Sequence, residues 1–174
     1  TLTISNGTVF PYRGDRTISN PVTHSGLRGP IAGFTGDYSL TLTGLWSDPS
    51  TTRTTRAIRN NTVSGKTLTL AGEYRATVGT TTRFVTFDGS GDTILSGPFT
   101  VVSNLDFGLA YAGTGSLTLS NAGNSYTGRT TVTSGTLRLG ADEVIPNSAV
   151  NPANNVVIFD PGLGLTATLD LNGR

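Results

Sequence analysis

A short phrase with apolar residues two positions apart recurs along the whole chain and constrains its fold more than any other feature. Each copy is followed within a few positions by Gly or Asn. The copies are TLTIS (1–5), SLTLTG (39–44), TLTLAG (67–72), SLTLS (116–120), TLRLG (136–140) and ATLDLNG (167–173). Alternate side chains of a strand point to the same face, so each phrase predicts a short strand with one apolar face.

The composition favours the same kind of structure. Only 13% of the residues are charged, Gly occurs 23 times, and Thr is abundant. The β-branched side chain of Thr suits a pleated surface, whereas Gly and Asn suit turns. No segment carries apolar residues at helical spacing without an interrupting Gly or Pro. We therefore expect a single all-β domain over residues 1–174, with little or no α-helix.

Two architectures are compatible with many short strands: a closed antiparallel sandwich or barrel, and a β-solenoid whose coils stack on one another. Hairpin signals are few, the best being SNG at 5–7 and FDG at 87–89. Antiparallel neighbours joined by tight turns would need more of them. The phrases also resemble one another, as equivalent positions of successive coils would. Both observations favour the solenoid.

Residues 113–140, GTGSLTLSNAGNSYTGRTTVTSGTLRLG, contain a Gly-rich lead-in, Leu-Thr-Leu, Asn-x-Tyr-Thr-Gly, Thr-x-Val and Gly-Thr-Leu-x-Leu-Gly in that order. This stretch resembles the autotransporter-associated β-strand repeat, and residues 141–150 and 167–173 resemble its usual sequel. The resemblance implies a right-handed parallel β-helix, here of about seven or eight coils. It also implies a secreted or surface-displayed bacterial protein in which the repeat is a stalk, spacer or adhesive scaffold without catalytic residues.

A stacked arrangement makes definite predictions about individual side chains. Within the repeat, we expect Asn124 at a left-handed corner, Gly128 at the next bend and Tyr126 as an amphipathic filler. Thr41, Thr69 and Thr118 should face outward. The alternating apolar residues should be buried in the core: Leu40, Leu42, Leu68, Leu70, Leu117, Leu119, Val132, Leu137, Leu139, Leu169 and Leu171.

Two motifs could bind metal or perform chemistry, but their context favours structural roles. His24 is the only histidine and has neither a nucleophile frame nor enough N or S ligands for zinc, so we expect it at the surface or at a coil corner. Asp88, Ser90 and Asp92 alternate as in the start of a calcium loop. However, Phe99 stands where that loop needs its twelfth-position carboxylate, which favours a Gly-rich turn.

Two further motifs could bind a partner. Arg13-Gly14-Asp15 matches the tripeptide of integrin ligands, although short motifs of this kind arise often by chance. Arg53, Arg56 and Arg59 are spaced three apart and could hold acidic glycans or phosphate groups. Without interleaved aromatic residues, a solvated loop is the simpler interpretation of these arginines.

The remaining features limit the function. A net charge of +1 gives no case for nucleic acid, and no apolar run is long enough for membrane insertion. The nine Asp are scattered and Lys66 is the only lysine, so no paired carboxylates of a glycosidase or lyase stand out. We expect no catalytic, cofactor-binding or metal-binding residues.

The function that we expect is a structural module of an extracellular or cell-surface protein. Because the chain begins and ends on strand phrases, copies of itself or further coils should meet both ends. The alternatives are an adhesin or glycan-binding module that uses residues 51–59 or 12–16, and a fragment of a carbohydrate-active enzyme.

Overall fold

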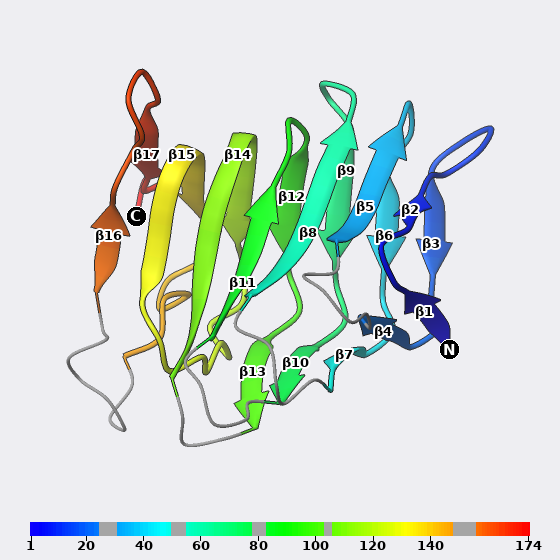
Figure 1. Ribbon diagram of the computed structural model, residues 1–174, viewed down its shortest axis with the longest axis horizontal. Helices are drawn as coiled ribbons and strands as arrows, with labels where there is room; N and C mark the ends of the chain where they lie inside the picture. Colours follow the sequence, from blue (N-terminus) through cyan, green and yellow to red (C-terminus); the bar gives the residue numbers. More distant parts are fainter. Residues whose placement is uncertain (25–30, 50–54, 78–82, 103–105, 148–155) are drawn as a thin grey trace.

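The computed structural model describes residues 1–24, 31–49, 55–77, 83–102, 106–147 and 156–174. These residues form a β-solenoid without helices. Every pair of neighbouring strands is parallel. Figure 1 shows the strands side by side along the long axis, with the two termini at opposite ends. Parallel pairing throughout excludes the antiparallel sandwich or barrel and confirms the solenoid.

The strands stack in three rows, and each row forms one side of the solenoid (Figure 1). The first row contains β1 (Leu2–Ile4), β4 (Val22–His24), β7 (Trp46–Asp48), β10 (Tyr74–Thr77) and β13 (Phe99–Val102). The second row contains β2 (Thr8–Val9), β5 (Ile31–Gly36), β8 (Thr55–Thr62), β11 (Arg83–Asp88) and β16 (Val157–Phe159). The third row contains β3 (Arg16–Ile18), β6 (Leu40–Leu42), β9 (Thr67–Leu70), β12 (Asp92–Leu95) and β17 (Ala167–Asp170).

Two longer strands, β14 (Phe107–Leu119) and β15 (Thr130–Leu139), bend from the second row into the third and extend both. The solenoid makes about five complete turns, because the first row contains five strands. The prediction of seven or eight coils is therefore too high. Beyond β13, the described residues add strands only to the second and third rows.

The third row carries the recurring Leu-x-Leu phrase. One inward column of side chains runs through this row, and each member lies in register with the next one turn away. In order, the column contains Leu40, Leu68, Thr93, Leu117, Leu137 and Leu169. Eight of the predicted core residues are buried: Leu40, Leu42, Leu68, Leu70, Leu117, Leu119, Val132 and Leu137. Their neighbours Thr41, Thr69 and Thr118 are more exposed and face outward, as predicted.

Four expectations about these phrases are wrong in detail. Leu139 and Leu169 are only half-buried and Leu171 is 49% exposed, because they lie in the last turns, where no described strand covers β17. The first phrase, residues 1–5, lies in the first row rather than in the third.

An aromatic column fills the solenoid behind the first row. Trp46, Tyr74 and Phe99 follow one another in register, with ring centroids 6.0 and 5.1 Å apart. The rings of Phe107 and Tyr126 continue the column beyond Phe99, at 5.7 and 5.0 Å. Such tilted and edge-to-face contacts add favourable energy to simple burial. The column holds successive turns in one continuous core.

A glycine column lies at the corner between the third and first rows. A Cβ on Gly44 would lie 2.2 Å from the carbonyl oxygen of Asn20. A Cβ on Gly72 would lie 2.1 Å from that of Gly44, and one on Gly97 would lie 2.0 Å from that of Gly72. Only a residue without Cβ permits such an approach, so these glycines set how closely the turns stack at this corner.

Candidate functional site

The segment Asn124-Ser125-Tyr126-Thr127-Gly128 joins β14 to β15 and connects three turns of the solenoid. The Oδ1 atom of Asn124 accepts a hydrogen bond from the Phe99 N–H at 2.8 Å, and its Nδ2 donates to the Val144 carbonyl at 2.7 Å. Asn124 is buried and does not have the left-handed φ that we predicted. The first row has no described strand after β13, and the Asn124 amide instead joins the neighbouring turns there. It does so by satisfying the buried N–H of Phe99 on one side and the buried carbonyl of Val144 on the other.

Tyr126 fills the core as predicted. Its ring stacks on Phe99 with centroids 5.0 Å apart, and its hydroxyl shares a hydrogen bond of 2.7 Å with Thr130 Oγ1. Burial raises the pKa of Tyr126 to about 12. The hydroxyl therefore stays neutral and cannot act as a base near neutral pH.

Gly128 forms the bend that leads into β15, as predicted. Its N–H donates to the Phe107 carbonyl at 2.9 Å, and a Cβ on it would lie 2.6 Å from the Gly108 nitrogen. The bend thus brings the turn that starts at Gly128 into close contact with the start of β14.

An open groove of about 360 Å³ lies beside this segment. Two segments line the groove, and the hydrogen bond between Asn124 and Val144 joins them. The lining residues are Ala122, Asn124, Ser125, Tyr126, Thr127, Glu143, Ile145, Pro146 and Asn147. Glu143 supplies the one carboxylate of this lining. A single carboxylate does not provide the acid and base pair that glycoside hydrolysis uses.

Comparison with known families identifies this region. Residues 109–139, which contain most of β14 and β15 and the whole connecting segment, match the passenger-associated-transport-repeat family. The chain carries an autotransporter-associated β-strand repeat. A search of curated proteins and a search of solved structures each found no match. The repeat and the solenoid are typical of structural passenger modules of autotransporters, which are secreted or displayed at the surface.

Outside the repeat, a buried ion pair lies inside the solenoid. Arg56 Nε donates to Asp48 Oδ1 at 2.8 Å, and the two side chains are 2% and 0% exposed. We expected Arg56 in a solvated loop, but residues 55–62 form strand β8 and the side chain points inward. Arg53 lies outside the described residues. Tyr74 lies near the pair, and its pKa is raised, first by burial and then by the charge of Asp48.

Arg59, the third arginine of that motif, lies on the outer face of β8. It forms a bidentate pair with Asp88, at 2.9 Å from Nε to Oδ1 and 2.7 Å from Nη2 to Oδ2. These hydrogen bonds raise the pKa of Arg59. The structure therefore separates Arg56 from Arg59 and engages both with carboxylates, so they do not form the anion-binding patch that was one interpretation.

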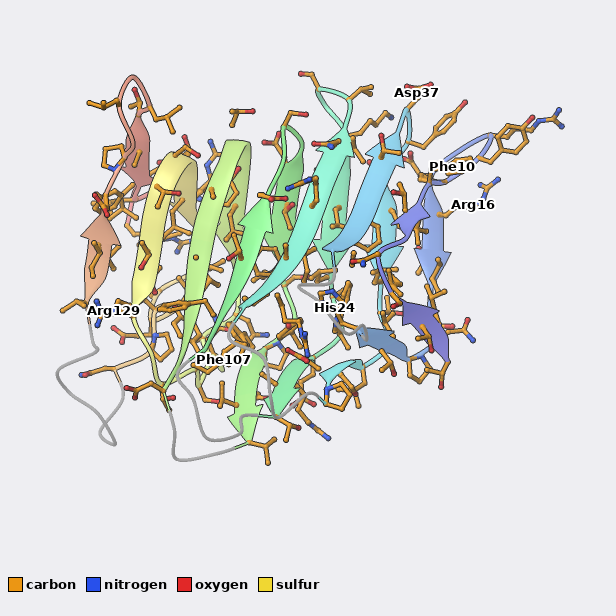
Figure 2. All side chains as sticks on the ribbon, viewed as in Figure 1. Phe10, Arg16, His24, Asp37, Phe107 and Arg129 are labelled. Atoms are coloured by element: carbon orange, nitrogen blue, oxygen red, sulfur yellow. The ribbon has the colours of Figure 1, made fainter. Side chains whose placement is uncertain are left out.

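His24 is buried, not at the surface or at a corner as predicted. It lies on the inner face of β4 (Figure 2). Its ring makes an edge contact with the ring of Trp46, with 5.9 Å between the two centroids. The alternation of β4 explains its position, because Val22 and His24 share the inward face.

Residues 88–92 form a Gly-rich turn between β11 and β12, as predicted. Asp88 turns to Arg59, whereas Asp92 Oδ1 accepts hydrogen bonds from the N–H and hydroxyl of Ser116. The Ser90 N–H donates to Asn61 Oδ1. The two carboxylates of the motif are therefore engaged by different partners, Asp88 by Arg59 and Asp92 by Ser116. Within the part of the chain that the structure describes, no group of three His, Cys, Asp or Glu could hold a metal ion.

Sequence reasoning missed several polar core residues, among them Asp48 and Asn60. Asn60 Nδ2 donates to the Asp92 carbonyl at 2.8 Å and to Thr93 Oγ1 at 3.2 Å, which connects adjacent turns. Asp48 could have been found from its spacing, since it lies two residues after Trp46 and must share its face. No helix of the described residues has the length and apolar character needed to cross a membrane.

Proposed function

We propose that this chain is a structural, non-catalytic module of an extracellular bacterial protein, in which the solenoid serves as a rigid spacer. One observation carries this proposal. The polar side chains that could have formed a site instead join one turn to the next, as in Arg59 with Asp88 and Asn124 with Phe99 and Val144. Side chains arranged in this way stabilise the stack rather than converge on a substrate.

A surface-display experiment tests the extracellular spacer role. The chain is fused at its C-terminus to an autotransporter translocator and carries an epitope at its N-terminus. We expect the epitope on intact cells, with the solenoid resistant to added protease. The Asn124→Ala variant should be displayed in a more protease-sensitive form, because two buried backbone groups lose their partner. An epitope that stays inside the cell contradicts the proposal.

The absence of catalysis requires a separate assay. Purified chain incubated with acidic polysaccharides should release no product above background. Turnover that disappears in a single Asp variant would show that the chain is an enzyme.

We further propose that coils of the same kind cover the C-terminal end of the stack. Strands β16 and β17 each have an edge that no described strand pairs. Large apolar side chains are exposed around them: Val156, Phe159, Leu163, Leu165 and Leu171. An unpaired edge beside apolar surface favours another strand in register, from the same polypeptide or from a second copy in a filament.

Light scattering over a wide concentration range separates these possibilities. A filament requires a mass that grows with concentration and that falls in a Leu165→Lys, Leu171→Lys double variant. A constant monomer mass rules the filament out and leaves further coils of one polypeptide.

A further inference from the structure

The turn between β2 and β3, residues 10–15, projects from the solenoid near its N-terminal end (Figure 1). Its aromatic side chains are exposed, Phe10 by 61% and Tyr12 by 63%. Arg13 and Asp15 are exposed as well. Aromatic and arginine side chains often contribute most of the binding free energy at protein–protein interfaces. This turn therefore has the composition of a contact surface rather than of a simple connection between strands.

The side chain of Arg16 and two residues with positive φ define the shape of this turn. The guanidinium of Arg16 donates from Nη2 to the Tyr12 carbonyl at 2.7 Å and from Nη1 to the Asp15 carbonyl at 3.0 Å. Arg13 has a left-handed φ of 60°, and Gly14 has a φ of 141° that L side chains rarely adopt. A turn fixed before binding loses less conformational entropy when it meets a partner.

Arg13 and Asp15 are directed to different places on either side of Gly14. The Arg13 guanidinium lies 5.0 Å from the centre of the Tyr12 ring. Asp15 Oδ1 accepts the Ser39 N–H at 2.8 Å and lies 3.8 Å from Lys66 Nζ. The Asp15 side chain is still 61% exposed, and among the described residues both of its contacts are made through Oδ1. The turn thus presents a guanidinium and a carboxylate separately.

We propose that this turn docks a receptor that presents a divalent cation to Asp15 and acidic side chains to Arg13, as integrin-class receptors do. A carboxylate oxygen is a preferred ligand of Mg²⁺, and a guanidinium pairs in bidentate fashion with carboxylates. The exposed rings of Phe10 and Tyr12 then pack against the rim of the receptor. An acidic glycan fits less well, because Asp15 repels it and Arg16 is engaged by carbonyls of the turn.

Binding to a panel of purified Arg-Gly-Asp-binding integrin ectodomains, measured by surface plasmon resonance with Mn²⁺, tests this proposal. We expect binding that EDTA abolishes and that a cyclic Arg-Gly-Asp peptide competes away. Asp15→Asn should weaken it by about tenfold or more, because the cation loses its charged ligand. Asn keeps an oxygen that can accept the Ser39 N–H, so the turn should keep its shape.

Two further variants make the result decisive. Arg13→Ala should weaken binding by a similar factor. Asp37→Asn, a matched change at an exposed position of the neighbouring β5–β6 turn, should leave it unchanged. Absence of binding by the native chain overturns the proposal, as does binding that survives both EDTA and Asp15→Asn. The latter result would point to a glycan or to another class of partner. The test does not depend on the spacer role.

Discussion

Arg56 and Asp48 form an ion pair inside the solenoid, 2.8 Å from Nε to Oδ1, and almost no part of either side chain reaches solvent. Asp48 enters from the first row and Arg56 from the second. Their contact therefore connects two sides of the same turn. Each charge stabilises the other in the interior, which makes the pair a sensitive point of the fold.

Removing one member of this pair should be costly. We expect Asp48→Ala to lower the free energy of unfolding by about 3–5 kcal/mol, because it leaves the Arg56 charge buried without a carboxylate. Urea denaturation measures the loss. The double variant Asp48→Ala, Arg56→Met should recover most of it, since no buried charge remains.

The outer pair Arg59–Asp88 provides the control. Arg59 is 43% exposed, so Asp88→Asn should cost at most about 1 kcal/mol. Equal losses at the two sites would contradict the assignment of Arg56 and Asp48 to the interior.

The Leu columns predict a graded response to truncation. Leu119→Ala should cost about 2–5 kcal/mol, because it opens a cavity at a fully buried site of the third row. Leu171→Ala, at the 49% exposed end of the last phrase, should cost much less. The denaturant midpoints of Leu119→Ala and Leu171→Ala, each compared with that of the native chain, measure the two losses. Similar losses would argue against a Leu column that is buried at Leu119 and exposed at its C-terminal end.

The glycine column should resist even a methyl group. Gly72→Ala places a Cβ 2.1 Å from the Gly44 carbonyl oxygen, so the two turns must separate and neighbouring strand hydrogen bonds must lengthen. Gly7→Ala is the matched change, because its Cβ would approach nothing closer than 4.0 Å. Thermal unfolding should show a marked fall in Tm for Gly72→Ala alone.

Glu73 should make stability depend on pH on the acid side. Hydrogen bonds from Arg75, and then from Thr100, lower its pKa below the ordinary value. The stabilisation is complete above the pKa of the unfolded chain and is lost as the pH falls through the lower, folded pKa. Glu73→Gln should flatten this part of the curve of unfolding free energy against pH. An unchanged curve would show that Glu73 does not contribute.

The sequence predicted the third row well because the Leu-x-Leu phrase recurs there on most turns. Strand β12 was not predicted, because it lacks the Leu-x-Leu phrase. Thr93 takes the inward position there that Leu occupies on other turns. Thr93 is accommodated because Asn60 donates to its hydroxyl. A polar side chain that is satisfied by a partner one turn away leaves no trace in a local pattern.

The burial of Arg56 and of Asn124 could not be predicted, for a related reason. Charged residues are normally exposed, so three spaced arginines indicate a solvated loop until the position of Asp48 is known. The same holds for Asn124, whose partners Phe99 and Val144 lie on different turns. By contrast, Tyr126 and Gly128 were predicted correctly because ring burial and tight bends are local properties of their motif.

Each strand of this solenoid pairs only with strands of adjacent turns, as the register of Leu40 with Leu68 illustrates. No distant part of the chain has to be available before a given turn can form, and every loop closure spans about the same length of chain. A turn that has already folded offers the next segment a ready template. The chain can therefore fold progressively from one end, with each completed turn serving as the edge on which the next segment pairs.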